Sequence, residues 1–403
     1  CTTYVATQVA EALRRAGARV RRLRLLRLNP AVKHKTRGNA AIAVHTDADP
    51  QTALEAAREV VDSLAELADE RTHPGVVAAP EPVEEPVQTF GQRAVRELLD
   101  LEAAEARIEA AGYPSAGWKT GRGKIGALAA IGASTARSDW TYEYIAYREP
   151  DRWGTQRSVA VDSVFEAAEA HYPAAWDTVD RGEGEPVCVP SAPGPILYGI
   201  RGDDPTAVAA VAAGIESEPV QASALFETNQ GTDSHLREAA IEDLQDDRAY
   251  RVTGRVVEPP ETRAGGHVFV TIAADGRRLP CVAFEPTKRF REHVRALRVG
   301  DRITAAGEVR DGTLKLEKFA ARELVEREAV TPTCQACGRR MESAGAKQGY
   351  RCRDCKTSTD SKALVPLDRD LEPGWYEVPP CARRHIAKPL VRGGFDAPTH
   401  PER

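Results

Sequence analysis

The chain has 403 residues, a length that allows about two to four domains, each with a core of its own. It contains 55 Lys and Arg residues and 60 Asp and Glu residues, and the resulting net charge of −5 excludes nucleic-acid binding through bulk charge alone. No apolar run approaches the roughly 18 residues of a membrane span and no signal peptide is visible, so we expect a cytoplasmic protein. Because the chain opens on Cys1 rather than on a methionine, we expect the natural N-terminus to lie upstream.

The first predicted domain covers residues 1–137 and combines helices with strands. Apolar residues at helical or alternating spacing indicate its elements. In chain order these are a helix over Thr2–Ala16, strands over Val20–Leu28 and Ala40–His45, and amphipathic helices over Gln51–Glu70 and Gln92–Ala111. A connector rich in proline and glutamate, Glu81–Pro86, separates the last two helices.

Two loops of this domain gather positive charge. Lys33–Asn39 places four basic side chains in a turn, which fits either a solvated loop or a phosphate site. Gly117–Gly126 holds three cations within six residues and a Gly-x-Gly-x-x-Gly pattern, ahead of a helix of small residues. Glycines allow close approach to a ligand and a helix N-terminus attracts anions, so phosphate is the expected guest. No strand is predicted before this loop, so a dinucleotide fingerprint is not supported, and a flexible turn beside a packed helix is the alternative.

The second predicted domain covers residues 138–245 and has the order β-α-β-β-α-β, the split βαβ or ferredoxin-like arrangement. Its predicted elements are strand Trp140–Arg148, helix 160–172, strand 176–190, strand Ile196–Arg201, helix Asp204–Gly214 and strand Pro219–Glu227. The last strand runs into Glu227–His235, a stretch too polar for a core. This stretch is either a hydrogen-bonded turn or the edge of a binding site for a polar substrate.

Residues 246–328 form the third predicted domain, with three strands, a helix and two further strands. These elements are Tyr250–Val257, His267–Ile272, Leu279–Phe284, Thr287–Leu297, Asp301–Val309 and Thr313–Phe319. The order suggests an OB barrel, which is a frequent nucleic-acid platform. Such barrels also serve as interaction modules, so the fold alone does not decide the function.

Four of the eight cysteines are the strongest signal in the chain. Cys334-x2-Cys337 and Cys352-x2-Cys355, separated by fourteen residues, have the spacing of a four-thiolate zinc site. Gly338 and Gly345 allow the tight turns. Four thiolates leave no position open for chemistry, so we expect a structural Zn²⁺ site, with another metal or a redox dithiol as alternatives. The other four cysteines are scattered, which is typical of a reducing cytosol.

The fourth predicted domain, residues 329–403, comprises this zinc ribbon and a tail. Tyr376–Lys388 in the tail is basic and forms either a phosphate-contacting strip or a solvated surface. The candidate RNA-binding residues of the whole chain are Arg255, Lys288, Arg353, Arg383, Arg384 and Lys388.

Six motifs occur together in this chain and in this order: Cys1-Thr-Thr-Tyr4, Leu28-Asn-Pro30, Lys35-Thr-Arg-Gly-Asn39, Gly117-Trp-Lys-Thr-Gly-Arg-Gly-Lys-Ile-Gly126, Leu197-Tyr-Gly-Ile-Arg-Gly202 and Thr228-Asn-Gln-Gly-Thr-Asp233. With the predicted barrel and the four cysteines, they closely resemble the archaeal 2-agmatinylcytidine synthetases over essentially the whole chain. That family modifies the anticodon of the AUA-decoding isoleucine tRNA, which has a CAU anticodon. The resemblance implies an α+β multidomain fold with an α/β kinase-like domain, a ferredoxin-like domain, an OB barrel and a zinc ribbon.

The resemblance also implies the chemistry. ATP phosphorylates the cytosine at the first anticodon position on its C2 oxygen, and the primary amine of agmatine then displaces the phosphate. The family's phosphoacceptor threonine corresponds to Thr2, and its Asp-Asp-Thr-Asp run, expected near ATP and Mg²⁺, precedes the cysteine on which this chain begins. The candidate ATP-binding residues are Lys35, Arg37, Asn39, Gly121, Arg122, Gly123 and Lys124. Agmatine is a dication, so its candidate ligands are the oxygen-bearing residues Glu227, Asn229, Gln230 and Asp233.

Two other functions compete with this one. A non-enzymatic nucleic-acid-binding protein would need the barrel and the ribbon but not both charged loops. Another ATP-dependent RNA modifier would keep the loops and differ around Asp233. Neither a membrane nor an obligate protein partner is expected.

Overall fold

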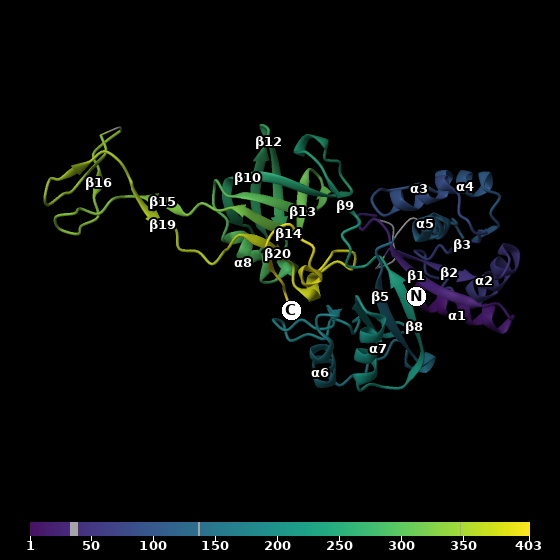
Figure 1. Cartoon of the computed structure of the whole chain (residues 1–403). Coiled ribbons are helices and arrows are strands. Elements are labelled where there is room, and N and C mark those ends of the chain that lie inside the picture. Colours follow the sequence, from purple (N-terminus) through teal and green to yellow (C-terminus); the bar gives the residue numbers. More distant parts are fainter. Residues whose placement is uncertain (33–38, 136–137, 347) are drawn as a thin grey trace.

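The computed structural model describes residues 1–32, 39–135, 138–346 and 348–403. In this part of the chain the protein is a mixed α/β structure of several parts, built on two large sheets (Figure 1). The predicted ATP-binding residues Lys35 and Arg37 lie outside the described residues. Helices in the described ranges are too short or too polar to cross a membrane.

The N-terminal part alternates helices with short strands. Its elements are α1 (Thr2–Arg15), β1 (Val20–Arg27), β2 (Ala40–Thr46), α2 (Pro50–Leu64), β3 (Gly75–Val77), α3 (Glu85–Ala94), α4 (Leu101–Ala110), β4 (Ser115–Gly117) and α5 (Gly123–Thr135). The single helix predicted over Gln92–Ala111 is wrong, because α3 and α4 share that stretch. Asp100 ends the break between them, since its side chain accepts a 2.7 Å hydrogen bond from Ala103 N and caps α4. α3 begins inside the predicted connector, with Pro86 in its first turn.

The small residues of α5 let this helix lie at backbone contact with α3. A Cβ atom added at Gly132 would lie 1.9 Å from Val87 O, and one added at Gly91 would lie 2.2 Å from Ala133 N. Neither position has room for a side chain. The contact fixes α5 against α3 and thereby fixes the position of the first turn of α5.

The next part contains β5 (Thr141–Arg148), α6 (Val161–His171), β6 (Ala175–Trp176), β7 (Ile196–Gly202), α7 (Pro205–Gly214) and β8 (Val220–Thr228), which is the predicted β-α-β-β-α-β order. Its strands join β1 and β2 in one six-stranded sheet of order β2-β1-β8-β5-β7-β6. The expected domain limit at residue 137 therefore separates segments that share a sheet. The strand predicted over 176–190 ends at Trp176, because turns follow in which Asp177 and Gly184 have positive φ, 54° and 69°.

The third part is a closed barrel, as predicted. Its elements are β9 (Leu236–Glu238), β10 (Arg248–Thr262), β11 (Val268–Ala274), β12 (Arg277–Ala283), α8 (Phe290–Arg295), β13 (Arg302–Arg310) and β14 (Thr313–Glu323). β12 pairs with β14, with Cys281 opposite Leu314, and this pairing closes the sheet around a buried apolar core. α8 is shorter than the helix predicted over Thr287–Leu297.

The four zinc-spaced cysteines lie in a small ribbon that stands apart at the end of a two-stranded stalk (Figure 1). The stalk pairs β15 (Arg327–Val330) with β19 (Ala363–Pro366), and the ribbon contains β16 (Glu342–Ser343), β17 (Tyr350–Arg351) and β18 (Ser358–Thr359). The chain then returns to the barrel, where β20 (Gly374–Glu377) pairs with β14 and β21 (Thr399–His400) pairs with β20. The sequence predicts the tail and the ribbon as one domain, and in the structure the tail adds two strands to the barrel sheet.

Candidate functional site

A large cavity lies in the N-terminal part, against the six-stranded sheet. Its volume is about 1610 Å³. The start of α1, β2, the segment 69–75 and the first turns of α5 form its wall. Arg27 on β1 and Glu143 on β5 contribute charged side chains from the sheet. The cavity therefore draws on both segments that meet in this sheet.

Four of the predicted catalytic and ATP-binding residues line this cavity. Thr2 is exposed in the first turn of α1. Asn39 lies at the end of the basic loop and donates from Nδ2 to the carbonyl oxygen of Asn29 at 2.7 Å. Arg122 and Gly123 come from the start of α5. Residues from distant parts of the chain thus meet at one cavity.

The loop before α5 does not form the free N–H cradle that the sequence predicts. β4 precedes this loop, although the sequence predicts no strand there. The N–H groups of Gly121, Gly123 and Lys124 each donate to a protein carbonyl oxygen at 2.9 Å, two of them within the loop and that of Gly123 to His73 ahead of β3. The turn offers the cavity the Arg122 side chain and the positive end of the α5 dipole.

The two lysines of this loop contact other partners. Lys124 Nζ lies 2.9 Å from Glu105 Oε1, and Lys119 Nζ donates to the carbonyl oxygen of Asp69 at 2.8 Å. Both lysines are among the described residues, and neither lines the cavity. The Lys124–Glu105 pair is partly exposed, and such pairs contribute about 0–1 kcal/mol. Little free energy therefore holds Lys124 away from an anion in the cavity.

Arg27, His45 and Glu143 also line the cavity, although the sequence does not predict them as site residues. Glu143 is 6% exposed, and its Oε2 lies 3.8 Å from Arg27 Nη2. Burial lowers the pKa of Arg27, while the Glu143 charge opposes that shift. Burial, followed by the charge of Arg24, lowers the pKa of His45, so this imidazole is neutral at pH 7. One feature of the sequence could have indicated Glu143 as a site residue. It is an acid at a core-facing position of the strand Trp140–Arg148.

Two of the residues predicted to bind agmatine lie behind the cavity. Asn229 and Gln230 are fully buried. Asn229 Oδ1 accepts a hydrogen bond from Arg27 N at 2.7 Å, and Gln230 Nε2 donates to Glu143 Oε2 at 2.5 Å. These amides therefore hold residues that line the cavity.

The other two predicted agmatine ligands, Glu227 and Asp233, are engaged in ion pairs. Arg24 Nε lies 2.7 Å from a Glu227 oxygen, and Lys318 Nζ lies 2.8 Å from an Asp233 oxygen. All four predicted residues are in the described part of the chain, and none of them lines the cavity. Their direct contact with agmatine stays a prediction.

The four predicted zinc ligands converge in the ribbon. Their sulfur atoms lie within 4.8 Å of one another in the group Cys334, Cys337, Cys352 and Cys355. Gly338 and Gly345 have the positive φ predicted for the tight turns, 72° and 125°. The N–H groups of Ala336 and Cys337 lower the pKa of Cys334 to about 6, whereas the hydrogen bond with Cys337 raises the pKa of Cys355 to about 12. Four sulfur donors at this separation fit a tetrahedral structural Zn²⁺ site with no open position.

Arg383, predicted to contact RNA, is not a surface residue. Its side chain is 2% exposed and pairs with Asp177 and, at 2.7 Å, with Glu377. The phosphate-contacting strip and the solvated surface are therefore both wrong for this residue. The physical reason is that the tail packs between the barrel and the β5–β8 part.

The other predicted RNA-binding residues fall into two groups. Arg255, Lys288 and Arg353 are 56%, 37% and 67% exposed, although each pairs with an acid. Arg384 and Lys388 lie in the C-terminal tail. Arg384 pairs with the buried acids Glu308 and Glu317, and Lys388 lies over the ring of Phe395. The first group is therefore better placed to reach a nucleic acid.

Three family models match successive segments of the chain. They are the TiaS TCKD domain over residues 1–120, the TiaS FLD domain over residues 121–235 and the TiaS C-terminal zinc ribbon domain over residues 331–371. The border between the first two models lies inside the Gly117–Gly126 loop.

Relatives of known name match the whole chain. A protein of Haloquadratum walsbyi is named as the 2-agmatinylcytidine synthetase TiaS of the second isoleucine tRNA. It is 54% identical over an alignment of 449 positions, which covers 100% of this chain and 96% of the relative. A protein of the same name from Methanosarcina acetivorans is 44% identical and covers 97% and 94%.

Solved structures agree with these relatives. A complex of TiaS with the second isoleucine tRNA and ATP matches with a TM-score of 0.90 at 40% identity and covers 100% of this chain and 96% of that one. A complex of TiaS with the same tRNA, AMPCPP and agmatine matches with a TM-score of 0.88 at 38% identity and the same coverage. These matches confirm the family indicated by the six motifs. The chain belongs to the TiaS family of isoleucine-tRNA 2-agmatinylcytidine synthetases.

Proposed function

We propose that this protein is an ATP-dependent ligase that attaches agmatine to C2 of the cytidine at the first anticodon position of the AUA-decoding isoleucine tRNA. The observation that supports it best is one cavity lined by Thr2, Asn39, Arg122 and Glu143. A candidate phosphoacceptor, a cation suited to phosphate and a buried acid suited to an amine meet there. Related structures are complexes with the second isoleucine tRNA, ATP and agmatine.

We propose that the reaction passes through a phosphorylated cytidine. The C2 oxygen of cytosine is a poor leaving group, and transfer of the terminal phosphoryl group of ATP to this oxygen makes it a good one. The amine of agmatine then forms a C–N bond to C2 and gives up a proton. The C2–O bond breaks, and phosphate leaves with the oxygen. The cytosine must be splayed out of the anticodon loop to reach the cavity.

The cavity residues have separate roles in this proposal. Arg122 and the start of α5, with Lys35, Arg37 and Lys124 of the predicted ATP set, stabilise the charge of the transferring phosphoryl group. Thr2 accepts phosphate, as the family resemblance implies. We expect Mg²⁺ to bind together with the phosphates of ATP.

Glu143 is our candidate for the group that receives the cationic substrate. Agmatine carries two positive charges, and this carboxylate is a buried acid on the cavity wall. Asn229 and Gln230 support it by fixing Arg27 and Glu143 through the hydrogen bonds described above. Asn229 and Gln230 thus enter the proposal one contact away from the substrate.

We further propose the roles of the remaining parts. The strand order β8-β5-β7-β6 supports a ferredoxin-like fold for that part, and the closure of β12 on β14 supports an OB fold. The ribbon holds one structural Zn²⁺, and Arg255, Lys288 and Arg353 contact tRNA phosphates. A cytoplasmic location accords with a tRNA substrate.

Mass spectrometry of tRNA nucleosides tests the proposal after incubation of the protein with ATP, agmatine and isoleucine tRNA of CAU anticodon. One cytidine per tRNA should gain the mass of agmatine less one water, and only when ATP is present. At low agmatine concentration Glu143→Gln should form much less of this product, whereas Glu109→Gln, which changes an exposed acid on α4, should keep it. Tight tRNA binding without any modified nucleoside would favour the non-enzymatic alternative. Conjugation of another amine in preference to agmatine would favour the other RNA modifier.

A further inference from the structure

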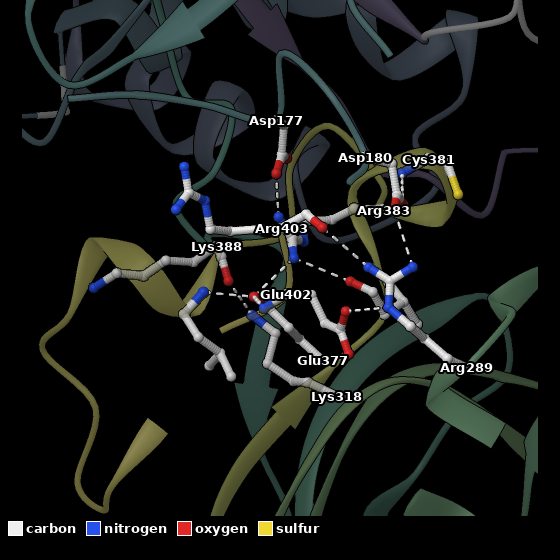
Figure 2. Close-up of polar contacts among 12 residues, drawn as sticks. Asp177, Asp180, Arg289, Lys318, Glu377, Cys381, Arg383, Lys388, Glu402 and Arg403 are labelled. Carbon is white, nitrogen blue, oxygen red and sulfur yellow. Dashed lines mark hydrogen bonds and ion pairs between the residues drawn. The ribbon is translucent and has the colours of Figure 1, made fainter. Parts of the chain in front are cut away.

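The C-terminal tail, residues 378–403, ties the barrel to the β5–β8 part through buried charges (Figure 2). We call it the tail strap. Arg383 bonds to Asp177, in the turn after β6, and lies 2.7 Å from Glu377 on β20. Asp180, in the same turn, is fully buried. Its Oδ2 accepts a hydrogen bond from Cys381 N of the tail strap at 3.2 Å, and its Oδ1 lies 3.0 Å from Arg289 at the start of α8. The tail strap therefore sets how the barrel sits on the sheet that carries Glu143.

The Thr228–Asp233 turn connects this junction with the cavity. In the middle of the turn, Gln230 Nε2 donates to Glu143 Oε2 at 2.5 Å. The next residue, Gly231, and the last, Asp233, donate their N–H groups to carbonyl oxygens of the tail strap at 2.8 and 3.0 Å. One short turn thus contacts both a cavity residue and the tail strap.

Asp233 anchors this turn on the barrel. Its two carboxylate oxygens accept hydrogen bonds from Lys318 Nζ on β14 at 2.9 and 2.8 Å, and Oδ1 also accepts one from Lys388 N at 2.7 Å. The Lys318 and Asp233 side chains are only 1% and 8% exposed. A buried ion pair adds little net stability compared with apolar replacements, and its best-attested use is to specify one geometry. The geometry specified here is that of the turn.

We propose that Asp233 is a positioning residue for the transfer of the amine. Its bond to Lys318 fixes the Thr228–Asp233 turn on the barrel, and the turn presents Gln230 to Glu143. The barrel thereby sets the position of the Glu143 carboxylate, which receives the substrate. This inference rests on the proposed function, in which Glu143 binds the cation, and it gives Asp233 an indirect role in place of direct contact with agmatine.

The test removes both charges of the pair with Asp233→Asn and Lys318→Met, so that neither charge is left buried alone. The KM for agmatine should rise by about 10- to 100-fold, the loss typical of a site group displaced by about 1 Å. The KM for ATP should change by less than about twofold. The matched control is Arg322→Met with Asp396→Asn, a 3.0 Å ion pair that also joins β14 to the tail strap but whose partners lie outside the turn. The control should keep the KM for agmatine.

A mutant cycle with Glu143→Gln separates positioning from direct contact. If Asp233 acts through Glu143, removing the Asp233–Lys318 pair should have little further effect on the KM for agmatine once Glu143 is replaced. Independent, multiplicative losses would overturn the inference, as would an unchanged KM in the pair variant. If that variant does not fold, Asp233→Glu, which keeps the charge but moves the carboxylate, enters the same cycle with the same expectations. A wild-type protein that transfers no agmatine would refute the proposed function instead.

Discussion

The substitution Gly123→Ala tests whether the first turn of α5 belongs to the ATP site. A Cβ atom at this position would lie 2.3 Å from Gly75 N and 2.7 Å from His73 O, both of which are backbone atoms. Ordinary contacts begin at 3.4 Å, so this turn and the start of β3 must separate by about 1 Å. Overpacking of this kind costs about 1–3 kcal/mol of stability. A displacement of about 1 Å in a site costs up to about 10²-fold in function.

The effect of Gly123→Ala is measured as the ATP affinity by calorimetry, the rate of ATP consumption and the thermal midpoint of unfolding. Gly123→Ala should lose about tenfold or more in ATP affinity. The control is Gly126→Ala, further along the same helix, where the nearest atom would be Ala41 Cβ at 3.3 Å. Gly126→Ala should lose little ATP affinity, and its stability should rise by up to about 1 kcal/mol because alanine has the higher helix propensity. If Gly123→Ala has a lower thermal midpoint but unchanged ATP affinity, the phosphates do not bind at the start of α5.

Three other substitutions test separate sites. Cys352→Ala should remove the zinc that elemental analysis counts and make the ribbon sensitive to proteases, because such a site supplies about 10–16 kcal/mol to the folding of its own module. The barrel should still unfold cooperatively. Zinc retained at one per chain would contradict this prediction. Lys124→Ala should lower the rate of ATP consumption by about 10²–10³-fold. Glu105→Ala, which removes only the ion-pair partner of Lys124, should leave that rate unchanged. Equal losses in the two variants would assign the effect to the ion pair instead of to contact with ATP. Burial raises the pKa of Glu377 to about 7 against the opposing charge of Arg383, so its ionisation costs stability increasingly from pH 4.5 to about pH 7. Over that window the free energy of unfolding of Glu377→Gln, measured by denaturant titration, should rise relative to that of the wild type by up to about 1.4 kcal/mol per pH unit. A constant difference would refute the shift.

Features encoded in short stretches of sequence were predicted well. The β-α-β-β-α-β order follows from alternation and helical periodicity, each of which a few consecutive residues display. The cysteine spacing located the ribbon because two of its ligands come from each tight turn. The break in the helix predicted over Gln92–Ala111 was also local, since Asp100 ahead of an apolar residue is a helix-start signal. This boundary could have been found.

Contacts between distant segments were beyond prediction from local patterns. Arg383 pairs with Asp177, 206 positions earlier, and is buried only because the tail strap returns between two parts of the molecule. Glu143 becomes a cavity residue because the sheet brings Arg27 and Gln230 beside it. In the sequence alone it is a single acid in a strand of tyrosines.

The zinc ribbon is inserted between two strands that are neighbours in the barrel sheet. β14 ends at Glu323 and β20 begins at Gly374, so during synthesis the barrel cannot complete its sheet until the whole ribbon has emerged. Asp301 holds both ends of the insertion, since it accepts hydrogen bonds from Val325 N at 2.8 Å and from Arg369 Nη1 at 2.6 Å. Closing a longer insertion costs only about 0.6 kcal/mol for each doubling of its length. A barrel of this design can therefore carry ribbons of different lengths in the course of evolution and change its reach along an RNA without rebuilding its core.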